Sequence, residues 1–272
     1  MNNEPDTDEL IRKLDARQPR TPGELLFERY LQQRRREFQY EEPLGGARPD
    51  FRVTSDHADV ICEVVEPEPT WPASRVGSGP DMHAEIRALI HRKRRQGKGA
   101  KGRMPYVMVV RPGGGIQPYE PFVVIGAMLG DVGFNVPVAP PKGRAGPITL
   151  VTTQGGRMQT AMNTRFSALA ILRIINPTRH LLDEAIRAAL RDVRGDLRAL
   201  KAIERVQDEL TAQGTYDPDL EVPRVDVFHN PYAATRLPLE FFDGAFDRQW
   251  AETGDGNVRL ALEGISAEFV GT

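Results

Sequence analysis

Residues 49–65 read PDFRVTSDHADVICEVV, and this stretch decides the fold that we expect. The four residues from Phe51 alternate between apolar and polar side chains, as in a strand with one buried face. The run from Val60 to Val65 is mostly apolar and β-branched, which is typical of an inner strand. The turn residues between the two runs predict that these strands are neighbours in a sheet.

Two carboxylates stand out against this apolar background. Strand periodicity places Glu63 on the same face as Ile61 and Val65, and a buried charge is costly unless it is paired or binds a cation. Asp50 begins the neighbouring strand, so a hairpin would bring the two carboxylates together. Carboxylate oxygens suit Mg²⁺ or Mn²⁺, which can orient a water and polarise a phosphate. The structural alternative is a hydrogen bond accepted by Asp50 and an ion pair at Glu63.

A helix is expected before this pair of strands. Residues 21–24, Thr-Pro-Gly-Glu, combine an N-cap residue, a proline suited to the first turn and a glutamate at the capping-box position. Apolar residues then recur at helical spacing, at Leu26, Phe27, Tyr30 and Leu31. Residues 38–42 alternate as a short strand between this helix and the pair.

A second helix and a fourth strand are expected after the pair. Asp81 can cap a helix that runs to about Gln96, where a glycine-rich segment begins. Residues 106–110, YVMVV, are apolar and indicate another buried strand. The order over residues 24–111 is therefore helix, three strands, helix, strand.

Three motifs in this region are Pro49-Asp50, Glu63-x-Val65 and Glu24-x-x-Phe27-x-x-x-Leu31. Together they resemble the PD-(D/E)xK nuclease superfamily. The resemblance covers residues 24–111, about a third of the chain. It implies an αβββαβ restriction-endonuclease-like core with a central mixed sheet flanked by helices. The later segment 228–233, FHNPYA, with Pro238-Leu239 and Phe242 after it, is similar to uncharacterised bacterial members of this group.

The resemblance also implies which residues hold the metal. In that family the aspartate and the glutamate are metal ligands, which implies Mg²⁺ or Mn²⁺ at Asp50 and Glu63. A glutamate on the preceding helix often joins them. Here that implies Glu24, although a capping-box role explains this residue almost as well. Glu28, one turn further on the same helix face, is the competing choice.

The chain departs from the family at the third position of the motif, where a lysine is replaced by Val65. Valine can neither position a water nor donate to a phosphate. Some relatives supply the cation from the following helix, and Lys93 is the natural candidate. The resemblance thus implies a deoxyribonuclease with Asp50, Glu63 and Lys93 as catalytic residues, with RNA also open as a substrate. The alternative is an inactive nuclease fold that serves in nucleic-acid binding or protein assembly, and Val65 is its best support.

A basic segment follows the candidate lysine. The net charge of the chain is −2, so affinity for a polyanion must come from a local patch. Residues 92–103 supply one, with Arg92, Lys93, Arg94, Arg95, Lys98, Lys101 and Arg103. We expect this segment to contact nucleic-acid phosphates, DNA above all. Solubility is the alternative explanation for so many charges.

The composition of the chain excludes several other classes of site and segment. The single cysteine, Cys62, excludes an internal disulfide framework and a cysteine-rich zinc site, and it favours a reducing cytoplasm. No run of 18 apolar residues occurs, so no membrane-spanning segment is expected. A role in defence against foreign DNA is an expectation of the resemblance alone.

We expect three regions along the chain. Residues 1–20 are a mobile polar extension, residues 21–115 are the nuclease-like core, and residues 116–272 are a C-terminal α+β elaboration packed on it. The fold expected for the whole chain is therefore α/β. In the elaboration, a long helix over about 179–211 carries an apolar stripe. That stripe suits packing, a homodimer contact or another protein partner.

Overall fold

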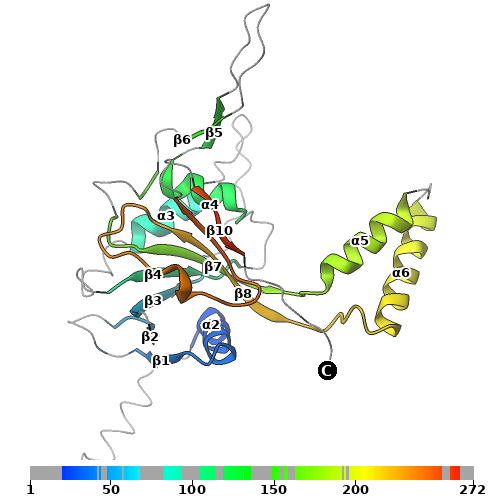
Figure 1. Cartoon of the computed structure of the whole chain (residues 1–272), viewed down its shortest axis with the longest axis horizontal. Helices are drawn as coiled ribbons and strands as arrows, with labels where there is room; N and C mark the ends of the chain where they lie inside the picture. The colour runs from blue at the N-terminus through cyan, green and yellow to red at the C-terminus, as the bar shows by residue number, and fades with distance from the viewer. Residues whose placement is uncertain are drawn as a thin grey trace, which may run out of the picture.

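The computed structural model describes residues 20–41, 43, 48–56, 58–67, 83–93, 104–113, 119–130, 132–135, 149–152, 156–158, 163–191, 193, 196–252 and 258–263. The described strands form an eight-stranded mixed sheet and a separate two-stranded sheet (Figure 1). In sheet order the large sheet contains β1 (Glu37–Tyr40), β2 (Phe51–Thr54), β3 (Asp59–Val65), β4 (Tyr106–Val110), β7 (Ala168–Ile175), β8 (Val222–His229), β9 (Arg248–Glu252) and β10 (Val258–Glu263). The small sheet pairs β5 (Val132–Asn135) with β6 (Thr149–Thr152).

Parallel strands form the centre of the large sheet. β3, β4 and β7 run parallel, whereas β1, β2 and β3 are joined by antiparallel pairings. β8 is antiparallel to β7, and β9 and β10 continue the same sheet. The expected α/β class with a mixed sheet flanked by helices is therefore confirmed.

Helices cover both faces of this sheet. α2 (Pro22–Gln33) lies on one face, and α3 (Ala84–Lys93) and α4 (Pro121–Leu129) lie on the other (Figure 1). The core is split accordingly into two apolar clusters, one on each face. Along β3, Cys62 and Val64 belong to the α2 cluster, whereas Ile61 and Val65 belong to the cluster under α3 and α4. Because side chains alternate along a strand, Glu63 faces the α3 side.

Several expected elements differ from the structure in their bounds. In the C-terminal region, the sequence over 131–147 is rich in proline and glycine, yet it contains β5, and the apolar run over 122–129 lies in the helix α4. The described part of α3 begins at Ala84 and ends at Lys93, while the expected limits of that helix, Asp81 and Gln96, lie outside the described residues. Of the polar extension over 1–20, only Arg20 is described.

The expectation of one long helix over 179–211 is wrong. Two helices occupy this region, α5 (Arg179–Leu190) and α6 (Asp196–Ala212), and they pack against each other (Figure 1). Their apolar stripes meet at Leu182 and Val206, next to Tyr216. A chain with such a stripe buries more apolar surface by folding back on itself than by staying extended.

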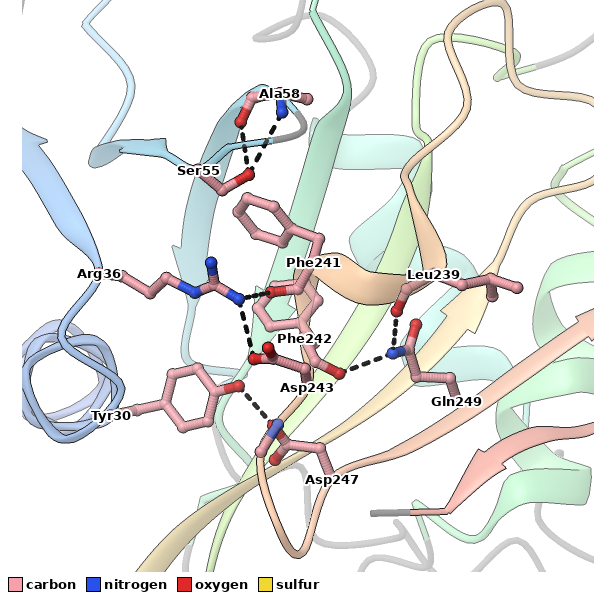
Figure 2. A network of polar contacts seen from close by, with 11 residues as sticks. Tyr30, Arg36, Ser55, Ala58, Leu239, Phe241, Phe242, Asp243, Asp247 and Gln249 are labelled. Carbon is pink, nitrogen blue, oxygen red and sulfur yellow. Dashed lines mark hydrogen bonds and ion pairs between the residues drawn. The ribbon is translucent and has the colours of Figure 1, made fainter. Parts of the chain in front are cut away.

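A buried polar network fixes the segment before β9 against α2 (Figure 2). The Tyr30 hydroxyl donates to Asp247 Oδ2 at 2.5 Å, and the same carboxylate accepts from the amides of Val225 and Gly244 at 2.9 and 2.8 Å. Gln249 donates through its amide to the carbonyls of Leu239 and Phe242. The network thereby ties α2, β8 and β9 together.

We expect Asp247→Ala to destabilise the protein by about 3 kcal/mol, because three donors lose their buried acceptor. The matched control is Asp243→Ala, since Asp243 is exposed and its contact with Arg36 at 2.8 Å is a surface ion pair. That change is expected to cost less than about 1 kcal/mol. Urea unfolding of both variants measures the difference, and equal losses would contradict this account of the network.

Candidate active site

The register of β2 and β3 brings the two predicted carboxylates together. Phe51 pairs with Cys62, so Asp50, which precedes β2, lies beside the carboxyl end of β3. Asp50 Oδ2 accepts a hydrogen bond from the Val64 amide at 2.7 Å. This bond holds the Asp50 carboxylate next to the strand that carries Glu63.

The predicted lysine also reaches this place. Lys93 lies in the last turn of α3, and its Nζ is 3.0 Å from Glu63 Oε1. The side chain of Glu63 is 9% exposed and that of Lys93 is 19% exposed, so the ion pair is largely shielded from water. The structure therefore groups Asp50, Glu63 and Lys93, although they come from the residue before β2, from β3 and from α3.

The pKa of Asp50 reports how crowded this group is. Burial raises this pKa most, and the negative charge of Glu63 raises it further, to about 7. The hydrogen bond from the Val64 amide and the charge of Lys93 act in the opposite direction. One lysine thus does not neutralise the two carboxylates. At neutral pH both the protonated and the charged form of Asp50 are populated.

This raised pKa predicts how stability depends on pH. The folded pKa lies above the usual value of 3.8, so the folded state binds this proton more tightly than the unfolded state. The stabilising contribution is complete below about pH 4 and is lost as the pH rises through about 7. Asp50→Asn should remove this dependence and stabilise the metal-free protein at pH 8 by about 1–2 kcal/mol, after allowance for solvent screening.

Denaturation in EDTA between pH 5 and pH 8 measures this effect. Asp59→Asn is the matched control, because Asp59 lies on the neighbouring strand β3 but its pKa is lowered by a hydrogen bond from Arg52. That variant should gain no stability at pH 8. If the Asp50→Asn variant is no more stable than the wild type at pH 8, burial and the charge of Glu63 do not raise the pKa of Asp50 as described.

Glu24 lies near the group but has partners of its own. It completes the capping box of α2, where its Oε2 accepts from the Thr21 amide at 2.7 Å. The Tyr40 hydroxyl donates to the same oxygen at 3.2 Å. The charge of Glu24 still contributes to the raised pKa of Asp50. Glu24 therefore caps α2, and its negative charge also raises the pKa of Asp50.

The competing glutamate has different partners. Glu28 pairs with Arg20, and it accepts from the side-chain amide of Gln32 at 3.3 Å. It is not among the groups that shift the pKa of Asp50. Of the two helix glutamates, Glu24 is thus the one that acts electrostatically on the predicted site.

Val65 occupies the third position of the motif as a core residue. It is 7% exposed and belongs to the apolar cluster under α3 and α4. Its side chain offers no polar group, so any cation at this site comes from another element, and Lys93 is the described residue that provides one.

Tyr106 is a neighbour of the site that the sequence did not indicate. It pairs with Ile61 across β3 and β4, and burial raises its pKa, as do the charges of Glu63 and Asp50. Its buried hydroxyl has no hydrogen-bond partner among the described residues. In the sequence Tyr106 is one more residue of an apolar strand, so nothing in the sequence indicates that it lies near Glu63 and Asp50.

Only the beginning of the basic segment is described. Arg92 is exposed at the end of α3, next to Lys93. The other predicted phosphate contacts, Arg94, Arg95, Lys98, Lys101 and Arg103, lie outside the described residues. Their contact with nucleic acid stays a prediction.

The carboxylates fit a divalent cation as a pair. Within the described ranges, no group of three or more His, Cys, Asp or Glu side chains could hold a metal ion. Mg²⁺, however, is commonly bound by one or two carboxylates together with waters and substrate phosphates. The repulsion that raises the pKa of Asp50 is of the kind that such a cation relieves. Asp50 and Glu63 therefore suit Mg²⁺ or Mn²⁺, whereas Glu24 has partners in the capping box.

Comparisons of this chain with models of protein families, with curated proteins and with solved structures give no match. Among the described helices, none is both long and apolar enough to cross a membrane.

Proposed function

We propose that this chain is a metal-dependent nuclease that hydrolyses phosphodiester bonds of DNA, with RNA as the second polymer to test. The observation that carries the proposal is the contact of Lys93 Nζ with Glu63 Oε1 at 3.0 Å, beside the buried carboxylate of Asp50. It supports a site in which a lysine on a helix stands in for the lysine of the motif, whose position is occupied here by Val65.

The order of elements also supports the proposal. α2, β1, β2, β3, α3 and β4 follow one another as in the αβββαβ core that the motifs imply. β2 and β3 are antiparallel neighbours, and α3 connects the parallel strands β3 and β4. We therefore propose a restriction-endonuclease-like core, which would place the site at the carboxyl end of β3.

Each residue of the group would have a separate task. Asp50 and Glu63 would hold Mg²⁺ or Mn²⁺, which when bound supplies positive charge that stabilises the reacting phosphate. Asp50 would release its proton as the cation binds, because a carboxylate ligand must be ionised. Lys93 would donate to a phosphate oxygen or to the attacking water, a task for which its ammonium group is held by Glu63. Arg92 and the basic residues after it would attract the backbone.

A second candidate is a nuclease fold that binds nucleic acid or assembles with proteins but does not cut. The burial of Val65 in the core favours it, because the usual catalytic lysine is absent from its own strand. This candidate predicts that Asp50→Ala leaves the biological activity unchanged. Reversing the charges of residues 92–103 would then abolish it.

The full chain, purified and supplied with Mg²⁺ or Mn²⁺, tests the proposal on single-stranded and duplex DNA and on RNA. We expect cleavage that EDTA abolishes. If every polymer stays intact with either metal, the nuclease proposal fails. Binding without cleavage, lost when the charges of residues 92–103 are reversed, would support the second candidate.

A further inference from the structure

A second charged cluster lies on the large sheet, away from the candidate active site. It is centred on Asp226 of β8, whose side chain is 2% exposed. Arg248 of β9 binds this carboxylate with two hydrogen bonds, from Nε at 3.0 Å and from Nη2 at 3.1 Å. Arg224 donates to Asp226 Oδ2 at 2.9 Å, and Arg173 Nε of β7 lies 3.7 Å from the same oxygen.

Strand register explains why these side chains meet. Arg173 pairs with Arg224 across β7 and β8, and Asp226 pairs with Arg248 across β8 and β9. Residues two apart on a strand share a face, so Arg224 and Asp226 point the same way. The three arginines therefore surround one carboxylate on three neighbouring strands, which lie side by side (Figure 1).

Three guanidinium groups lie close to one another around a single buried carboxylate. Burial lowers the pKa of Arg173 most, and the charges of Arg224 and Arg248 lower it further, against the opposite effect of Asp226 and of the exposed Glu120. Arg248 is also paired with Glu263 across β9 and β10. Like charges held this close and partly buried are stabilised by a further anion.

The guanidinium groups also reach the surface of the protein. Their Nε atoms at Arg173 and Arg224 are buried, and Arg173 Nη2 donates to the Tyr119 carbonyl. The side chains of Arg173, Arg224 and Arg248 are still 27, 18 and 27% exposed, so they cover Asp226 and face solvent. Guanidinium groups in this arrangement match the oxygens of a phosphate, which they bind through paired hydrogen bonds.

We propose that Arg173, Arg224 and Arg248 form a binding site for a phosphate group. The phosphate has two possible sources, the backbone of a nucleic acid and a free phosphate or phosphorylated small molecule. The backbone source rests on the proposed function, whereas the phosphate site itself does not.

Its position suits the backbone source. Glu63 is aligned through Met108 with Leu169, and Arg173 lies four residues further along β7, on the same face of the sheet. Strand spacing and rise then put Arg173 about 16 Å from Glu63. That is about five phosphates along one strand of duplex DNA, at ~3.4 Å each. One polymer could thus contact both places.

Inorganic phosphate is the first probe. We expect 20 mM phosphate to raise the Tm of the full chain by about 3–5 °C over chloride of equal ionic strength. Arg173→Gln/Arg224→Gln should lose this shift, because Arg248 alone suffices for Asp226. Arg187→Gln/Arg205→Gln, which removes the same charge from exposed positions on α5 and α6, should keep it. No shift in the wild type, or an equal shift in the Arg173/Arg224 variant, would overturn the proposal.

A variant of the central acid gives an independent measurement. Asp226→Asn removes the carboxylate and leaves the three arginines, so it should lower the Tm in chloride and gain more from phosphate than the wild type. A phosphate shift smaller than that of the wild type would count against the site.

Duplex DNA in EDTA distinguishes the two sources without any cleavage. If the backbone binds here, Arg173→Gln/Arg224→Gln should weaken binding about tenfold and lower the salt slope by about two. Unchanged DNA affinity with an intact phosphate shift would assign the site to a small phosphorylated ligand. Neither measurement needs a metal or catalysis. The phosphate site can therefore be tested even if the nuclease proposal fails.

Discussion

Replacing Glu63 by glutamine is expected to lower metal-dependent cleavage about 10³-fold or more, because the loss of one of two carboxylate ligands removes the cation that stabilises the phosphate. Asp50→Ala should have the same effect, since Asp50 and Glu63 are the two carboxylates that meet beside β3. Calorimetry with Mn²⁺ should show about one equivalent bound by the wild type and none by either variant.

The control for this prediction changes a carboxylate on the same strand. Asp59 begins β3, away from the site, and pairs with Arg52 at 2.6 Å. Asp59→Asn should therefore keep both Mn²⁺ binding and cleavage. If Glu63→Gln binds Mn²⁺ as the wild type does, the metal is held elsewhere and the assignment of these carboxylates is wrong.

The proton that Asp50 carries makes the same experiment sensitive to pH. Its pKa of about 7 means that Mn²⁺ competes with a proton below that pH. Apparent Mn²⁺ affinity should therefore fall between pH 7.5 and pH 6, with proton release detectable in buffers of different ionisation enthalpy. This follows from the burial of Asp50 and from its closeness to Glu63.

Local patterns in the sequence were enough to predict the elements around the site. The alternation along β3 placed Glu63 on the face of Ile61 and Val65, and the described clusters agree. The capping box of α2 was readable from Thr21 and Glu24, and the structure contains it. Both features depend on residues close in the chain, where the periods of helix and strand apply directly.

Features that depend on tertiary contacts were harder to predict. The stripe over 179–211 keeps one helical period, and a period does not show that the chain folds back between α5 and α6. The arginines around Asp226 lie on three strands far apart in the chain, so only the sheet register assembles them. Tyr106 likewise comes within the electrostatic influence of Glu63 and Asp50 only through the pairing of β3 with β4.

Lys93→Met is expected to lower cleavage by about 10²–10³-fold while Mn²⁺ binding is kept, because the lysine supplies a donor and no ligand. Mn²⁺ should even bind more tightly, since Glu63 loses the ammonium group 3.0 Å away that competes with the cation. Single-turnover cleavage and calorimetry on the same preparation separate the two effects. Arg92→Met is the matched control, as Arg92 is the exposed neighbour on α3 and should affect cleavage only through general attraction.

The outcome for Lys93 decides what the valine at position 65 means. Lost cleavage with retained Mn²⁺ binding would show that the cation has moved from β3 to α3, and that the apolar side chain of Val65 then serves the core. Unchanged cleavage in Lys93→Met would contradict this role and leave the contact with Glu63 as a structural ion pair. A wild type that binds Mn²⁺ but cuts nothing would favour the binding module, because a two-carboxylate site can persist after its donor has lost its function.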